Sequence, residues 1–201
     1  MTAATAPFAP APAPTTIVDA VWTRSRTRDL ALVVGAALLT AAAAQIRIPI
    51  PGTPVPVTGQ TFAVLVTGAA LGWRRGSAAQ LLYVAAGAIG LPVFNGATGG
   101  WEAATGSTAG YLVGFVIAAA AVGALAERHQ DRDIATSLPA MLAGSAVIYL
   151  FGAAWLAIHL DIPAAEAVDI GIAPFVIGDA AKLLAAGACL PAAWGLVGRR
   201  D

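Results

Sequence analysis

The stretch APFVIGDAAKLLAAG, from Ala173 to Gly187, decides how the rest of the chain is interpreted. It is apolar along most of its length, yet it holds Asp179 and Lys182, and Lys182 is the only lysine in the sequence. Residues three apart lie on one face of an α-helix, so an acid and a base are expected side by side. Two charges inside an apolar helix call for a specific role.

The composition of the whole chain predicts a membrane protein. Only 11% of the 201 residues are charged and 58% are hydrophobic, whereas soluble domains carry about 25% charged residues. The formal net charge is zero, which gives no support for nucleic-acid binding. A single cysteine, Cys189, excludes a disulfide framework and a cysteine metal cluster, so no metal site is expected.

Six stretches are apolar enough, and long enough or nearly so, to cross a bilayer, which takes about 20 helical residues. The second and third are short, so they are either tilted spans or one broken hairpin. We therefore expect an all-α integral membrane protein, a bundle of six transmembrane helices. The expected spans are residues 30–46, 60–71, 76–90, 108–126, 137–159 and 174–197.

The chain divides into two predicted regions. Residues 1–28 form a disordered Ala/Pro-rich tail, because repeated prolines prevent a helix and no signal-peptide pattern is present. Residues 29–199 form the transmembrane domain. With six spans, nine of the ten arginines fall on the side of the termini and only Arg47 falls on the other. Basic residues prefer the cytoplasmic side, so both termini are predicted to be cytoplasmic.

The loops on the other side differ from simple connections. Residues 47–59 hold four prolines, and residues 91–108 combine glycines with aromatic side chains and Asn95. Asp179 and Lys182 follow the third loop closely. One interpretation is an ion pair that only fixes the helix. Because each charge at the bilayer centre costs about 2.5–3.5 kcal/mol, we favour a pair that binds one polar ligand from that side.

Four motifs carry a resemblance to a known family. They are PVPVTGQTF (Pro54 to Phe62), GLPVFNG (Gly90 to Gly96), GSTAGYLVGF (Gly106 to Phe115) and IGDAAKLLAA (Ile177 to Ala186). In this order the chain resembles the BioY family, the biotin-specific substrate-binding (S) components of energy-coupling-factor (ECF) vitamin transporters. Ile177 stands where the family usually has proline, and GSTAGY replaces the commoner GPTGGY; these departures affect helix entry and loop stiffness.

The resemblance implies a bacterial cell-membrane protein that takes up biotin and is no enzyme, with biotin as the transported ligand and no cofactor. Asp179 and Lys182 would bind the ureido ring, whose two N–H donors and one carbonyl match a carboxylate and an ammonium. The other ligand-binding residues expected around them are Asn95, Gln60, Tyr111, Thr58, Phe94 and Trp101.

Active uptake would need other proteins. The sequence has no GxxxxGK[ST] phosphate loop, so the resemblance implies a membrane coupling (T) protein and paired ATP-binding cassette ATPases. Ala37 and Ala41, four residues apart on the first span, are expected to meet the coupling protein. The alternative is a proton-coupled secondary transporter of a small polar solute, in which Asp179 relays protons.

Overall fold

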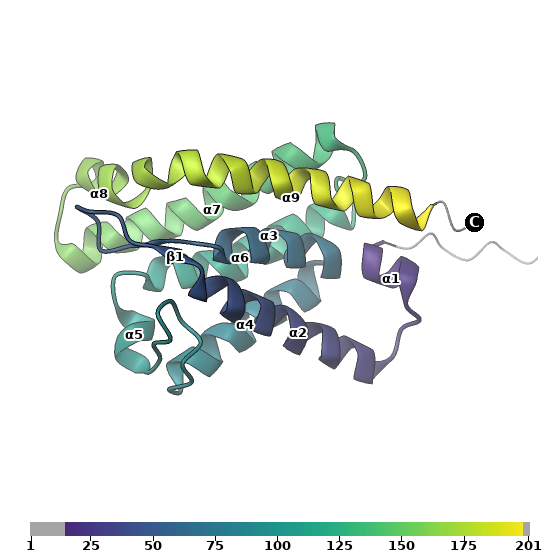
Figure 1. Ribbon diagram of the computed structural model, residues 1–201, viewed down its shortest axis with the longest axis horizontal. Coiled ribbons are helices and arrows are strands. Elements are labelled where there is room, and N and C mark those ends of the chain that lie inside the picture. The colour runs from purple at the N-terminus through teal and green to yellow at the C-terminus, as the bar shows by residue number, and fades with distance from the viewer. Residues whose placement is uncertain (1–14, 199–201) are drawn as a thin grey trace, which may run out of the picture.

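The computed structural model describes residues 15–198, and most of them are helical, as predicted (Figure 1). Two short strands, β1 (Arg47–Ile48) and β2 (Val57–Thr58), pair antiparallel in the first loop. The helices are α1 (Ile17–Val21), α2 (Arg26–Gln45), α3 (Gln60–Leu71), α4 (Trp73–Ala88), α5 (Trp101–Thr105), α6 (Ala109–Ala126), α7 (Ile134–Leu160), α8 (Ala164–Gly171), η1 (Ala173–Phe175) and α9 (Val176–Val197).

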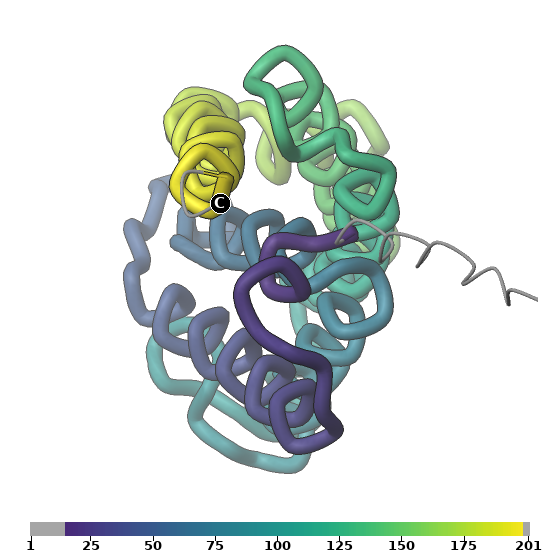
Figure 2. Tube along the Cα trace, turned by 90° about the vertical axis from the view of Figure 1, so that its right-hand side faces the viewer, coloured from purple at the N-terminus to yellow at the C-terminus, as the bar shows by residue number. Residues whose placement is uncertain are grey.

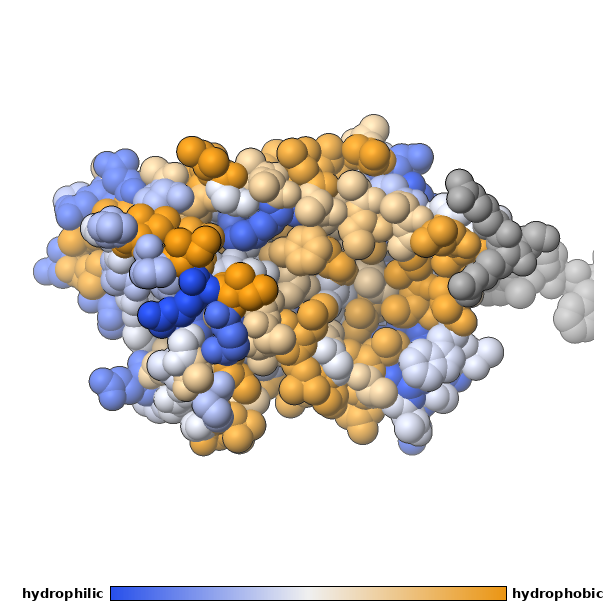
Figure 3. Space-filling model, viewed as in Figure 1, coloured by the Kyte–Doolittle hydropathy of each residue, from blue (hydrophilic) through white to orange (hydrophobic). Residues whose placement is uncertain are grey.

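The longer helices α2, α3, α4, α6, α7 and α9 form one bundle along the long axis of the molecule (Figures 1 and 2). Four helical segments in the described chain are long and apolar enough to cross a membrane: Arg26–Gln45, Ala109–Ala126, Ile134–Leu160 and Ala164–Val197. The surface agrees with a membrane protein, because a hydrophobic band covers the middle of the bundle between two more hydrophilic ends (Figure 3). The count of six spans stays a prediction.

The short second and third stretches form a tight helical hairpin. Gly72, the one residue between α3 and α4, has a φ of +83°, which favours glycine. A Cβ on Gly76 would lie 2.9 Å from the Cα of Gly68, so the two backbones touch beside the turn. With 12 residues, α3 is about 18 Å long, shorter than the roughly 30 Å hydrocarbon core. These are two helices turned back on each other, and no continuous span joins them.

Small residues let α6 occupy the centre of the bundle. A Cβ on Gly114 would lie 2.9 Å from the Cα of Ile148 in α7, and a Cβ on Gly68 would lie 2.9 Å from the Cα of Ala119. Backbones of neighbouring helices can approach this closely only where side chains are absent. These glycines therefore let α6 pack closely against α3 and α7.

The two ends of the bundle differ. Helix α1 and the last turn of α9 lie at one end, while the β1–β2 pair, α5 and α8 lie at the other (Figure 1). The boundary predicted for the tail needs correction, because α1 lies within residues 1–28 and α2 already begins at Arg26. Residues 1–14 of that tail, and the end of the predicted transmembrane domain at residue 199, lie outside the described residues.

The expected partner contact on α2 also needs correction. Ala37 is 6% exposed and packs in the core of the bundle, and Ala41 is partly buried against the same core. The face of α2 that points outward carries Ala31, Gly35 and Ala42 instead. In a helix this rich in alanine, spacing alone does not tell which small residues face outward.

Candidate functional site

A cavity of about 50 Å³ lies between α3, α4, α6, α7 and α9, beneath the first loop. Typical ligand pockets measure about 300–1,000 Å³, so a vitamin-sized ligand requires the surrounding segments to separate. Seven of the eight expected ligand-binding residues line it: Asp179, Lys182, Asn95, Gln60, Tyr111, Thr58 and Phe94.

The acid and the base on α9 form a direct ion pair. Lys182 Nζ lies 2.6 Å from Asp179 Oδ1, and it also donates to the carbonyl oxygen of Thr58 at 2.5 Å. Asp179 is only 4% exposed and stands in the first turn of α9, where the helix dipole stabilises a negative charge. Lys182 thereby links α9 to the strand that ends the first loop.

Tyr149 of α7 is the site residue that the sequence analysis missed. Its hydroxyl donates to Asp179 Oδ2 at 2.6 Å, and its side chain lines the cavity. Each carboxylate oxygen of Asp179 therefore has one donor. The sequence offers no signal for this role, because Tyr149 stands in an apolar run where any aromatic residue suggests core packing.

A second polar group lies on α3 and α4. Gln60 donates from Nε2 to the hydroxyl of Tyr83 at 2.7 Å, and its Oε1 accepts from Thr58 at 2.9 Å. Tyr83 packs edge-on against Phe94, with ring centroids 5.5 Å apart. This cluster fixes the amide of Gln60 and positions an aromatic wall beside it.

Tyr111 contributes mainly its ring to the wall. The hydroxyl donates to the carbonyl oxygen of Gly171 at 2.6 Å, which joins α6 to the end of α8. Gly152 of α7 packs directly on this ring, and a Cβ there would overlap it. With its hydroxyl engaged, Tyr111 offers the cavity an aromatic face.

The second loop is held over the cavity by Gln45, the last residue of α2. Its Nε2 donates to the carbonyl oxygen of Phe94 at 3.1 Å, and its Oε1 accepts from the backbone N–H of Ala97 at 3.0 Å. Asn95 thus stays at the rim. The expectation that Trp101 lines the ligand site needs correction. Trp101 is not part of the cavity lining and is 73% exposed, because it is the first residue of α5 and its side chain faces outward.

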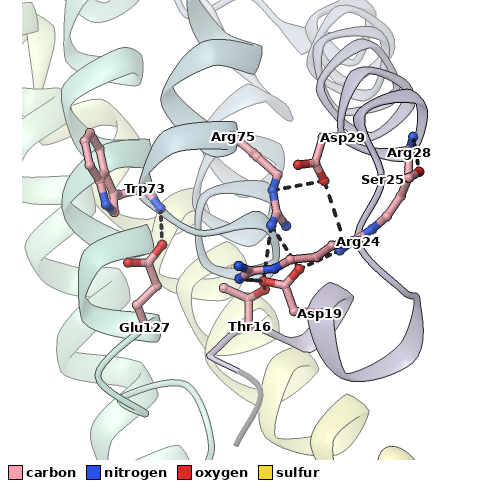
Figure 4. A network of polar contacts seen from close by, with 9 residues as sticks. All are labelled: Thr16, Asp19, Arg24, Ser25, Arg28, Asp29, Trp73, Arg75 and Glu127. Carbon is pink, nitrogen blue, oxygen red and sulfur yellow. Dashed lines mark hydrogen bonds and ion pairs between the residues drawn. The ribbon is translucent and has the colours of Figure 1, made fainter. Parts of the chain in front are cut away.

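The opposite end of the bundle holds a separate polar network (Figure 4). Asp19 of α1 accepts hydrogen bonds from Arg24, Arg28 and Arg75 at 2.8–2.9 Å. Burial alone would raise the pKa of the Asp19 carboxyl, but the three guanidinium groups outweigh it and hold that pKa well below its usual range. The network fastens α1 to α2 and α4.

The chemistry of the cavity suits a ligand with both donors and an acceptor. One carboxylate and one ammonium lie side by side, beside aromatic walls from Phe94, Tyr111 and Phe175 and an aliphatic side chain from Leu112. Within residues 15–198, no group of three or more His, Cys, Asp or Glu side chains could hold a metal ion.

Comparisons with known proteins bear on the whole chain. It is 40% identical over 140 residues to the biotin transporter BioY of Thermotoga maritima, an alignment that covers 69% of this chain and 80% of that protein. It is 36% identical over 168 residues to the biotin transporter BioY of Rhizobium etli, covering 80% of this chain and 89% of that protein.

The fold is similar to a crystal structure of the S-component for biotin from an ECF-type ABC transporter. The TM-score is 0.73 at 22% sequence identity, and the match covers 84% of this chain and 93% of that one. The family model described as the BioY family matches residues 15–199. The chain belongs to the BioY family.

Proposed function

We propose that this protein is the membrane-embedded biotin-binding subunit of an ECF-type ABC transporter and serves biotin uptake. The relatives above are named biotin transporters, and the fold matches that of an S-component for biotin. The observation that carries the proposal is the Asp179–Lys182 pair, which lies in an aromatic cavity under the first loop.

The pair has unused capacity for the ureido ring of biotin. An ionised carboxylate offers about four lone-pair sites, and Asp179 uses one on each oxygen, for Lys182 and Tyr149. Two sites remain for the two ureido N–H groups. Lys182 donates to the carbonyl oxygen of Thr58 in the absence of a ligand, and the ureido oxygen can take the place of that acceptor.

The walls fit the apolar remainder of the ligand. Phe94, Phe115 and Phe175 line the cavity together with Leu112 and the ring of Tyr111. They can bury the sulfur-containing ring and the aliphatic chain, whose contribution to affinity scales with the apolar area removed from water. Gln60 and Asn95 add amide groups at the α3 wall and at the rim.

The proposal includes partners and an orientation. The sequence lacks a phosphate-binding loop, so ATP hydrolysis belongs to paired ATPases joined through a membrane coupling protein. We propose six spans in a bacterial cell membrane, with α1 and the end of α9 at the cytoplasmic face. This is supported by the arginine network around Asp19 at that end and by the loops near the cavity, residues 46–59, 89–108 and 161–172, in which Arg47 is the one arginine.

Reconstitution distinguishes this function from a proton-coupled transporter. Purified protein in detergent should bind labelled biotin saturably without any ion gradient. In liposomes, the chain with its coupling protein and ATPases should accumulate biotin when ATP is supplied. Accumulation driven by a proton gradient, with the chain alone and no ATP, would contradict the proposal.

A further inference from the structure

Arg47 stands apart from the other basic residues of the described chain. Apart from Lys182, it is the only basic residue in the segments around the cavity end, residues 46–59, 89–108 and 161–182. It begins β1 and pairs in register with Thr58 of β2, a residue that lines the cavity. Its position is therefore at the mouth of the cavity, one strand away from the lining.

The guanidinium of Arg47 lies beside the second loop. Its Nη1 packs against Gly96 so closely that a Cβ at that position would overlap it. Gly96 directly follows Asn95, which lines the cavity, and has a φ of +71° that favours glycine. The backbone of residue 96 thus leaves room for the arginine at the rim.

The guanidinium of Arg47 has no hydrogen bond or ion pair within the part of the chain that the structure describes, and the residue is exposed. The backbone that carries this side chain is nevertheless fixed. Gln45 is bound to the 94–97 segment by two hydrogen bonds, and Arg47 itself is held by strand pairing. An unpaired guanidinium on a fixed backbone is prepared to bind an anion.

The proposed ligand has such an anion. Biotin carries a carboxylate at the end of its aliphatic chain, opposite the ureido ring. The cavity lining contains one basic residue, Lys182, which is paired with Asp179. The carboxylate therefore has no unpaired cationic partner within the lining. Arg47, whose guanidinium packs against Gly96 next to the lining residue Asn95, is positioned to supply one.

We propose that Arg47 binds the carboxylate of the ligand at the mouth of the cavity and sets the preference for a free acid over a neutral derivative. This rests on the proposed function. The planar guanidinium can donate two parallel hydrogen bonds to one carboxylate. Arg47 would then bind the carboxylate end of the ligand, while Asp179 and Lys182 bind the ureido ring at the other end.

Binding of biotin and of its neutral primary amide separates this role from others. Wild-type protein should bind biotin about ten times more tightly than the amide. This factor is at the low end of the range for a charge-assisted hydrogen bond, because the Arg47 side chain is exposed to solvent. Arg47→Gln should lower affinity for biotin by that factor and leave affinity for the amide unchanged. Arg47→Lys should keep part of the preference, and the matched control Arg74→Gln, at the other end of the bundle, should keep all of it.

Each possible binding result either supports or contradicts the role of Arg47. The proposal is wrong if Arg47→Gln keeps the wild-type preference, or if it loses both ligands by the same factor, which would indicate a structural role. Equal affinity of the wild type for biotin and its amide also overturns it, while the proposed function stands. Wild-type protein that binds neither ligand would instead overturn the function itself.

Discussion

At the scale of single residues, the buried carboxylate of Asp179 is stabilised before any ligand arrives. It accepts from Lys182 and Tyr149, both at 2.6 Å, and a buried charge is tolerated only when it is paired and hydrogen-bonded. The two donors also fix the direction of the carboxylate. A site arranged this way loses little side-chain entropy when the ligand binds.

Replacing Tyr149 with phenylalanine tests this arrangement. The change removes the hydroxyl that orients Asp179 Oδ2 and keeps the ring, so we expect biotin affinity to fall about tenfold. Titration calorimetry would measure the change. Tyr111→Phe is the matched control, because it removes a bond to the Gly171 carbonyl and should lower the melting temperature more than the affinity. Unchanged affinity in Tyr149→Phe would show that Tyr149 does not position the carboxylate.

At the scale of elements, the long apolar helices could be predicted closely and the short ones could not. The expected spans 60–71 and 108–126 agree with α3 and α6 within one residue. Helices α1, α5 and α8 have five to eight residues, too few for a hydrophobic period to show. They are formed by tertiary contacts, such as the arginines that surround Asp19.

The faces of α2 show a second limit of sequence reasoning. In a soluble helix, polar residues mark the outside, but a membrane helix has an apolar outside as well. The sequence pattern therefore could not show that Gly35 faces outward and Ala37 faces the core. In the structure, Gly35 has open space beyond its Cα, whereas Ala37 is buried. Similarly, the motif resemblance identified most of the cavity residues, whereas Tyr149 and Gln45 join the site only through the packing of distant helices.

Bulky substitutions on α2 test the corrected face. We expect Gly35→Trp to leave biotin binding unchanged and to abolish ATP-driven uptake, because it blocks close approach of a coupling helix. Ala37→Trp should instead destabilise the bundle, since its side chain would enter the core. Uptake in proteoliposomes and thermal unfolding in detergent measure the two effects. Normal uptake by Gly35→Trp would mean that the coupling contact lies elsewhere.

At the scale of the whole molecule, charge is divided between the two ends of the bundle. At one end, Asp19 forms ion pairs with three arginines, Arg24, Arg28 and Arg75. The other end holds the cavity and Arg47. Positive charge favours the cytoplasmic side. A cavity at the opposite end would therefore open outward, toward a vitamin supplied from the medium.

Cysteine labelling tests this orientation in intact cells. In a Cys189→Ala background, Thr98→Cys should react with an impermeant thiol reagent, and Arg128→Cys should react only after permeabilisation. Both positions are exposed, so a silent site reports its side of the membrane and not burial. Labelling of Arg128→Cys with silence at Thr98→Cys would reverse the orientation.

The central claim is that Asp179 and Lys182 hold the ligand, and biotin binding by the double variant Asp179→Ala/Lys182→Ala tests it most directly. Each single variant leaves one charge unpaired and is ambiguous, because an unpaired buried charge destabilises the fold by itself. Removing both charges eliminates that penalty. Binding is measured by titration with biotin, and folding by thermal unfolding of the same sample. We expect the double variant to fold and to bind biotin more weakly. Loss of one hydrogen bond to a charged group should lower the affinity about 10- to 150-fold, and loss of both groups should lower it by at least as much. A folded double variant that binds biotin as tightly as the wild type would contradict the account, and would leave the pair as a purely structural ion pair.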